Sequence, residues 1–513
     1  MHKYFYPLLK KAGSLAVVII LTSGCSSVID ARKQKKPYMD DYYSGSVTRV
    51  AAELSEKSDD RADTGDELMW LLDAGTANYT AEQYQKSLQL FEKSESLIQE
   101  FDARAVVNAR GVGAEIGSTI TNANALPYRG MYLDRIMLHS YKALNYFAIN
   151  DTSGAHVELR RMREAQQQVV RKFDDELRAS EQEIQEYNLQ NQQKSRSLGN
   201  KNTTVPFSTI IKNPVVNEAY TVSEAKSNKL YGSLGNPFVS YFSAMGYLME
   251  NNYGEALVDF RNLYKMIPNN KLIQRDYVTA AKRIGSEIPV EIELIEPFAY
   301  PLNNKIVYVV LFNGRAPALK QEKFQLILPY VGYTGIAFPR YEYFSPQLQG
   351  LDIAYKLNNQ QESVKTEQIA NFDAIMSQEY HNKLPAMVTR LVVSTLAKEL
   401  ASYAIVQAAR RSNQSNNGAE LGALVLTGMF KYLFNTADTR GWETLPKEVQ
   451  VTHFPVPDGG RLRISPVNMA GSAAQGNYSQ GTEIVLNKET NIAIVYVRAL
   501  SEKKLIYKVI ELQ

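Results

Sequence analysis

The sequence predicts an α+β protein, with an α-helical array in the N-terminal half and a β-rich C-terminal domain that contains an inserted helical segment. Residues 47–287 have helical character, and three of their segments align with one another. From residue 288, short β-branched and aromatic runs are separated by turn signals such as Asn-Gly and Pro. Helical character returns over residues 385–435. With 44% hydrophobic residues, the 513-residue chain can build sizeable cores.

Residues 1–24 have the layout of a secretory signal peptide. Basic residues come first, an apolar run follows at Leu15–Leu21, and small residues precede Cys25. This end resembles a lipobox, the acylation site of bacterial lipoproteins, although Thr22 stands where leucine is preferred. The alternative is a plain membrane anchor with an incidental cysteine. The apolar run argues against it, because a membrane-spanning helix needs about 20 residues.

Cys25 is therefore expected to carry the lipid that holds the mature chain on a membrane. It is the only cysteine, which excludes disulfides and cysteine metal sites in the mature chain. Ser26 follows it in place of aspartate, which resembles the signal for export to the outer membrane of a Gram-negative bacterium. Residues 25–46 predict a flexible tether of roughly 25 Å. Docking of this segment on the protein body is the alternative.

Charge gives no argument for nucleic acid as a partner. The chain has 57 Lys and Arg against 54 Asp and Glu, and three of the lysines lie in residues 1–24. The mature chain is therefore formally neutral, without the basic excess of a nucleic-acid-binding protein.

Three segments of the helical half resemble the tetratricopeptide repeat, a 34-residue helix–turn–helix. In each, two small residues stand twelve positions apart and a large apolar residue follows four positions later: Gly75, Ser87 and Phe91; Ala143, Ala155 and Leu159; Ala244, Ala256 and Phe260. Small residues let two helices approach closely, and the large residue fills the gap beneath the next pair. The alternative is an array of helical hairpins without the superhelical geometry.

An insertion at residues 155–235 interrupts the array. Its first part predicts a long polar helix, roughly 155–192, with a narrow apolar seam. Its second part, residues 193–235, is rich in Asn, Ser, Lys and Gly and predicts an inserted loop.

The C-terminal domain, residues 288–513, predicts a series of strands. They are expected at Val290–Leu294, Ile306–Phe312, Phe324–Pro329, Ile336–Pro339, Val449–Phe454, Arg461–Ile464, Thr482–Leu486, Ile492–Arg498 and Leu505–Leu512. Within the helical insertion, Leu421–Phe434 is apolar nearly all round but too short to span a bilayer. We expect a buried core helix there, and a membrane-dipping or partner-binding helix is the alternative.

The arrangement resembles a family of uncharacterised proteobacterial lipoproteins that pair a tetratricopeptide-like N-terminal half with a β-rich C-terminal half. The similar residues are Val309–Pro317 with Lys320, and Ala437–Pro446. The resemblance covers most of the mature chain. It implies an architecture but no activity, because none is assigned to the family.

No catalytic or cofactor motif is found in the chain. The five histidines lack metal-ligand spacing, and there is no nucleophile elbow, phosphate loop or dinucleotide fingerprint. The sequence His156-Val-Glu158 lies within a predicted helix and is interpreted as part of a solvated face. The sequence therefore predicts no catalytic residue, no cofactor and no metal.

Asp438, Arg440 and Trp442 are the most site-like group. Asp and Arg two positions apart, followed by Trp, could form a bidentate ion pair capped by an aromatic ring. The favoured interpretation is a structural corner between the apolar helix and the C-terminal sheet. The Asn-Gly pair before Arg315 predicts a turn, which is the favoured interpretation. The second interpretation is a ligand loop, in which Arg315 and Lys320 would contact the ligand.

Together these observations predict a non-enzymatic outer-membrane lipoprotein that faces the periplasm. Its membrane contact is the lipid on Cys25, and its tetratricopeptide-like surface is expected to bind a protein or peptide. The alternatives are an enzyme or enzyme activator acting on the cell envelope or peptidoglycan, housed in the β-rich half, and an accessory component of a secretion or polymer-export system. The missing His or Cys centre disfavours an enzyme.

Overall fold

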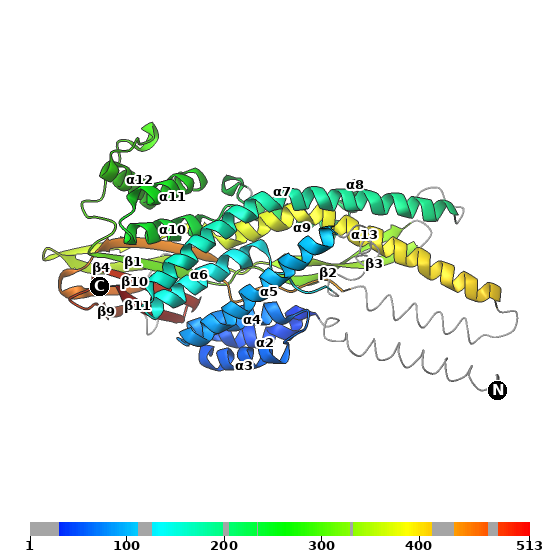
Figure 1. The fold of residues 1–513 in the computed structure, drawn as a ribbon, viewed down its shortest axis with the longest axis horizontal. Helices are drawn as coiled ribbons and strands as arrows, with labels where there is room; N and C mark the ends of the chain where they lie inside the picture. Colours follow the sequence, from blue (N-terminus) through cyan, green and yellow to red (C-terminus); the bar gives the residue numbers. More distant parts are fainter. Residues whose placement is uncertain are drawn as a thin grey trace.

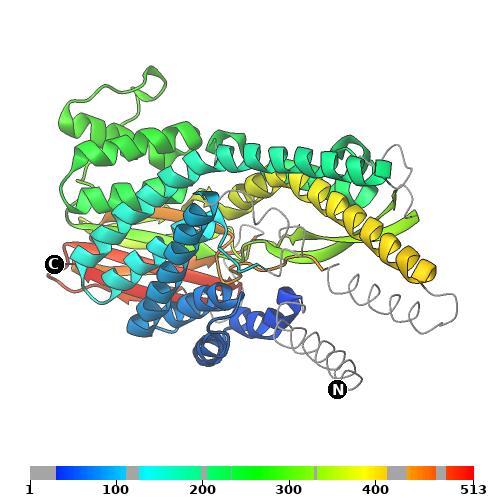
Figure 2. The ribbon, with the colours of Figure 1, turned by 45° about the vertical axis from the view of Figure 1, so that its right-hand side comes forward.

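A computed structural model describes residues 30–110, 126–197, 205–232, 234–328, 332–412, 436–469 and 481–512, and it confirms the α+β class. Helices make up the N-terminal half, and the C-terminal half is β-rich with one long helix (Figure 1). Two long helices and a β-hairpin extend away from the sheets, toward the right in Figures 1 and 2. Cys25 and Leu421–Phe434 lie outside the described residues.

The helices cover one side of the sheets. They are α2 (Ala31–Ser44), α3 (Val47–Asp60), α4 (Glu67–Thr80), α5 (Tyr84–Arg110), α6 (Tyr132–Ala148), α7 (Thr152–Ser197), α8 (Phe207–Ile210), α9 (Pro214–Lys226), α10 (Pro237–Met249), α11 (Tyr253–Met266), α12 (Lys271–Ile284) and α13 (Phe372–Ser412), with the 3₁₀ turns η3 (Lys229–Tyr231), η4 (Val290–Ile292) and η5 (Asp458–Gly460). No helix of the described part is long and apolar enough to cross a membrane.

The strands form two sheets and a separate hairpin. Their bounds are β1 (Ile306–Asn313), β2 (Ala318–Leu328), β3 (Gly332–Glu342), β4 (Gly350–Leu357), β5 (Gln360–Lys365), β6 (Glu367–Asn371), β7 (Glu448–Pro455), β8 (Arg461–Val467), β9 (Thr482–Val485), β10 (Ile492–Ser501) and β11 (Lys504–Leu512). The larger sheet has the order β11-β10-β1-β7-β6, the smaller one β5-β4-β8-β9, and β2 pairs with β3. Only β1 and β10 are parallel among these described pairs.

Strand β1 explains the layering, because it is buried on both faces. Tyr308 and Phe312 face a core shared with the helices, and Val309 and Leu311 face a second core shared with the smaller sheet. A strand covered on both sides loses the alternation of polar and apolar residues, which matches its unbroken apolar sequence. The described chain thus has three layers: helices, the five-stranded sheet and the four-stranded sheet.

The helices pair as hairpins through the predicted small residues. Ser87 Oγ donates to the carbonyl of Gly75 at 2.8 Å, and a Cβ on Gly75 would lie 2.6 Å from the ring of Phe91. Gly75 is therefore required for the close approach of α4 and α5. Ala244 and Ala256 are likewise fully buried, one on α10 and one on α11. The tetratricopeptide superhelix itself stays a prediction.

Three sequence predictions are wrong at the level of local structure. The expected flexible tether is helix α2 from residue 31 onward, and its Met39 and Tyr42 are fully buried. The expected loop at 193–235 contains helices α8 and α9, and α9 is capped by the Asn213 side chain, which accepts from the backbone of Val215. The expected strand at Val290–Leu294 is the 3₁₀ turn η4 followed by a loop.

Other boundaries and elements also differ from expectation. Strands β4, β5 and β6 were not predicted, and the helix expected from 385 begins at Phe372 as α13. The long helix expected at roughly 155–192 is confirmed as α7, which is longer at both ends. Strands β1, β2, β3, β7, β8, β9, β10 and β11 all overlap their predicted runs.

Candidate functional site

Residues 437–447 run without regular secondary structure between the helices and the five-stranded sheet. This segment, which we call the junction segment, contains Asp438, Arg440 and Trp442. Its described side chains are buried or half-buried. It therefore covers the faces of α2 and α4 that it contacts.

Asp73 of α4 is the centre of the contacts to the junction segment. Its Oδ1 accepts from the backbone N–H groups of Glu443 and Thr444 at 3.0 and 2.9 Å, and from the Thr444 hydroxyl at 2.9 Å. Its Oδ2 pairs with Lys35 Nζ at 2.5 Å, and both side chains are fully buried. Lys35 also donates to the carbonyl of Gly441 at 2.5 Å. One carboxylate thus joins α2, α4 and the junction segment.

Arg440 forms the predicted bidentate pair with Asp438. Its Nε and Nη2 donate to the two carboxylate oxygens at 2.8 and 2.7 Å. Nη1 reaches Asp66 at 3.2 Å and the carbonyl of Leu126 at 2.9 Å, on the loops around α4 and α6. The ring over the guanidinium is that of Tyr128, at 5.8 Å. These contacts support the structural interpretation, because acceptors from three parts of the chain already bind the guanidinium at Nε, Nη1 and Nη2.

Trp442 does not cap this ion pair, as the ligand-site interpretation would require. Its indole Nε1 donates to the hydroxyls of Thr76 and Thr444, each at 2.9 Å. Its ring packs among Phe91 and Tyr141, with centroids 5.7 and 5.5 Å away. Trp442 therefore anchors the junction segment in the helical core.

The structure separates Arg315 from Lys320. Arg315 is mostly buried, pairs with Glu443 at 2.7 Å and lies over the ring of Phe344 at 4.3 Å. Lys320 lies on the β2–β3 hairpin, is half-buried and pairs with Glu322 at 3.1 Å. The two cations do not form one ligand loop, and Arg315 instead belongs to the contacts of the junction segment.

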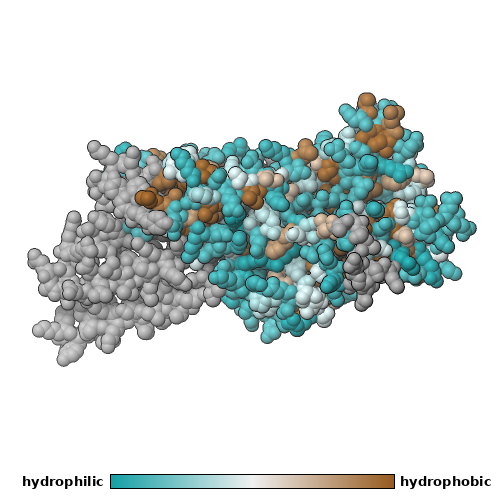
Figure 3. Space-filling view, turned by 180° about the vertical axis from the view of Figure 1, so that it is seen from behind, coloured by the Kyte–Doolittle hydropathy of each residue, from teal (hydrophilic) through white to brown (hydrophobic). Residues whose placement is uncertain are grey.

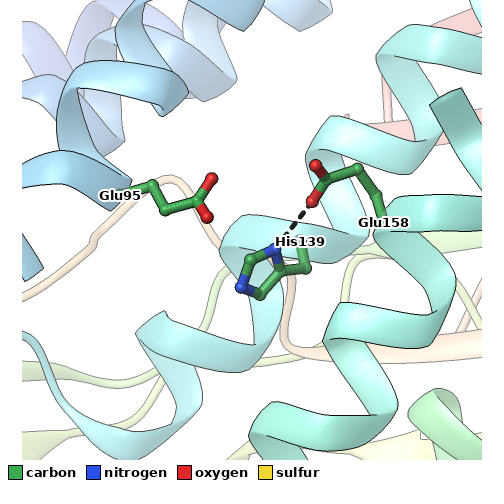
Figure 4. Close-up of side chains that lie close together, drawn as sticks. All are labelled: Glu95, His139 and Glu158. Carbon is green, nitrogen blue, oxygen red and sulfur yellow. Dashed lines mark hydrogen bonds and ion pairs between the residues drawn. The ribbon is translucent and has the colours of Figure 1, made fainter. Parts of the chain in front are cut away.

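Glu95, His139 and Glu158 meet on α5, α6 and α7, and their possible ligand atoms lie within 4.8 Å of one another (Figure 4). His139 Nδ1 lies 2.7 Å from a carboxylate oxygen of Glu158. Within the described residues this is the sole group with such a spacing of metal-binding atoms. Because Glu158 is buried, the interpretation of His156-Val-Glu158 as a solvated face is wrong for Glu158.

Lys142 already supplies a cation to this cluster. Its Nζ lies 2.6 Å from Glu95 and 2.9 Å from Glu158, and Arg161 lies 3.0 Å from Glu158. Burial works to raise the pKa of Glu158, but hydrogen bonds from His139 and Lys142 outweigh it and the pKa is lowered. Glu158 is thus ionised and neutralised by the chain's own cations. A metal ion would have to displace Lys142, so the donor set fits a structural ion-pair network better than a metal site.

His453 and Asp276 form a second buried pair, between β7 and α12. His453 Nε2 lies 2.7 Å from Asp276 Oδ1, and Nδ1 lies 3.3 Å from the hydroxyl of Tyr300. Burial raises the pKa of Asp276, and His453 opposes the shift. The small cavity beside the pair, lined by residues such as Phe260, has no room for a water molecule. A substrate could not reach the pair, so a structural role fits best.

Comparison of the chain with protein-family models, curated proteins and solved structures finds no match. The surfaces of this chain are therefore the basis for inferring its function.

The turn after α12 is the most exposed apolar feature of the described chain. Leu294 is 95% exposed and Val290 81% exposed. The turn projects at the upper left of Figure 1 and forms the brown knob at the upper right of Figure 3. Ile292, between them, is buried and holds the turn to the body. We call residues 287–296 the apolar turn.

A groove of about 440 Å³ runs between α7 and α13. Its apolar wall includes Leu177 and Met387. Its charged side chains already have partners within the chain, since Lys383 forms an ion pair with Glu176 at 3.1 Å and Arg390 donates a hydrogen bond to Ser180 at 2.9 Å. The groove therefore offers shape but little unsatisfied polarity to a ligand.

Proposed function

We propose that the chain is a lipid-anchored adaptor of the outer membrane, facing the periplasm, which binds a protein partner through the end of its helical array. The observation that carries the proposal is the exposure of Val290 and Leu294 in the apolar turn. Isolated apolar side chains on a surface are common, but two large ones that project from one turn favour a contact site.

The residues of the apolar turn indicate what kind of partner surface would fit it. Four glutamates, at positions 287, 291, 293 and 296, surround Val290 and Leu294. A matching partner has an apolar pocket with lysine or arginine at its rim. The junction segment occupies the helix face beside Asp73 and Trp442, so the partner is not expected to bind there.

The adaptor role is tested by cross-linking in intact cells. A photoactivatable residue in place of Leu294 is expected to capture one discrete protein, and Leu294→Asp combined with Val290→Asp should remove that protein from a co-purification. The matched control is Leu189 on α7, which is 59% exposed but far along another element. Equal capture from positions 189 and 294 would contradict the apolar turn as the binding surface.

The anchor is tested separately with Cys25→Ser. Without its thiol the chain cannot be acylated, so the variant is expected in a soluble or unprocessed pool, whereas the wild type fractionates with outer membranes. Fractionation and immunoblotting measure the difference. A variant that stays with outer membranes as fully as the wild type would show that lipidation is not the anchor.

A further inference from the structure

The apolar turn is fixed to the helices at both of its ends. Before it, Arg261 of α11 donates a hydrogen bond to the hydroxyl of Ser286 at 2.9 Å. At its end, Arg275 of α12 donates to the carbonyl of Glu296 at 3.0 Å. The two exposed apolar side chains therefore project from a fixed support, and little conformational entropy is lost when a partner binds them.

The groove between α7 and α13 has the apolar wall that such a turn requires. Leu177 and Ala179 of α7 and Ala386 and Met387 of α13 line it, and none of these four side chains is fully buried. Its volume of about 440 Å³ leaves space for side chains of the size of valine and leucine. Because the charged side chains of the groove already have partners, an apolar insertion suits it better than a polar ligand.

The charges of the two surfaces are complementary. All four glutamates of the apolar turn are exposed. Two cations, Lys383 and Arg390, line the groove against one carboxylate, that of Glu176. Lys383 pairs with Glu176 and with Glu379, and the first of these ion pairs is partly exposed. Such a pair is weak, so the ammonium can accept a further carboxylate at the rim of the groove at small cost.

The apolar turn and the groove lie apart within one chain. Figures 1 and 2 show α12 and the turn at the left of the molecule, whereas the contact between α7 and α13 lies toward its middle. Ile292 is buried and Arg275 holds the end of the turn, so the turn does not fold back into the groove of its own chain. A second copy can supply the turn instead. Each such contact leaves one turn and one groove unoccupied, so further copies can add head to tail.

We infer that the apolar turn of one copy inserts Val290 and Leu294 into the groove between α7 and α13 of a second copy, so that the chains assemble head to tail. The inference rests on the proposed function, because it identifies the protein partner of the apolar turn as another copy of this chain. Two apolar side chains make a small contact, so the assembly is reversible and depends on protein concentration.

The test uses the full chain purified in detergent and two variants that each damage one surface. Leu294→Asp alters the turn, and Ala179→Glu places a carboxylate in the groove at an exposed position of α7. In analytical ultracentrifugation, the mean mass of the wild type is expected to rise with concentration, whereas each variant alone stays monomeric. An equimolar mixture of the two variants should form a one-to-one dimer, because each keeps the surface that the other lacks. Gln168→Glu, exposed on α7 outside the groove, is the matched control and should assemble like the wild type.

The outcomes separate this self-contact from the proposed function. A wild type that stays monomeric, or a mixture of variants that stays monomeric although the wild type assembles, would overturn the self-contact. In intact cells, the photoactivatable residue at position 294 should give a product of twice the chain's mass, joined to a peptide that contains Leu177 or Met387. Capture of a different protein there would overturn the self-contact and leave the adaptor proposal standing. If the purified chain assembles but nothing is captured in cells, the self-contact stands and the adaptor proposal fails.

Discussion

An Asp73→Ala variant is expected to lose about 3–5 kcal/mol of unfolding free energy, because it leaves the buried ammonium of Lys35 without its counter-charge. The substitution also deprives the backbone N–H groups of Glu443 and Thr444 of their acceptor. Each buried donor left without a partner adds its own cost. Urea unfolding followed by circular dichroism measures the loss. The helices and the five-stranded sheet share one core, so the loss of stability is expected in both the helical half and the β-rich half.

Two control variants isolate the buried pair. Asp40 on α2 also pairs with a lysine, Lys36 at 2.5 Å, but both side chains are exposed. Asp40→Ala should therefore stay close to the wild type. Lys35→Met together with Asp73→Leu removes both charges and should recover part of the lost stability. A wild-type unfolding curve for Asp73→Ala would refute the central role of this carboxylate.

The strands with a strong local signal could be predicted from sequence. Strand β1 and the first part of β10, up to Val497, are continuous apolar runs because each is buried on both faces. Strand β4 carried a usable signal that the prediction missed, since Leu351, Ile353 and Tyr355 are buried and alternate along it. Strand β5 had none, because it is an exposed, polar edge strand.

Helix α2 shows why composition misled the prediction. Its sequence is polar and includes Lys33, Lys35 and Lys36, which is typical of a linker. Lys35 is buried because Asp73 neutralises it from 38 positions away. The opposite error occurs at Val290 and Leu294, where apolar alternation predicted a strand but no neighbouring strand pairs with it among the described residues. A local sequence pattern carries no information about packing partners that are distant in sequence.

The clusters of polar residues could not be assembled from sequence for the same reason. Glu95, His139 and Glu158 come from three helices and have no common motif spacing. Asp73 and Thr444 are 371 positions apart. Of the predicted site residues, Asp438 and Arg440 were found together because they are local partners, two positions apart. Arg315 and Lys320 share a segment of sequence, but the start of the hairpin carries them to different surroundings.

Arg440→Met is expected to cost about 3–5 kcal/mol of unfolding free energy, because Asp66 is buried and would lose its cation. The carbonyl of Leu126 would also lose a donor. Arg440→Lys should fall between this variant and the wild type, since an ammonium keeps the charge but cannot make the bidentate contact to Asp438. Thermal unfolding of the ligand-free protein ranks the three.

Arg461→Met is the matched control, because Arg461 pairs with Glu483 at 3.0 Å on the surface and should contribute little. The comparison decides between the two interpretations of Asp438, Arg440 and Trp442. A structural corner requires the large loss, because the guanidinium links the junction segment to the loops around α4 and α6. A ligand site would instead leave the unfolding temperature of Arg440→Met at the wild-type value, since a group reserved for a ligand adds nothing to stability before the ligand binds. The burial of Arg440 against four groups of its own chain favours the first result.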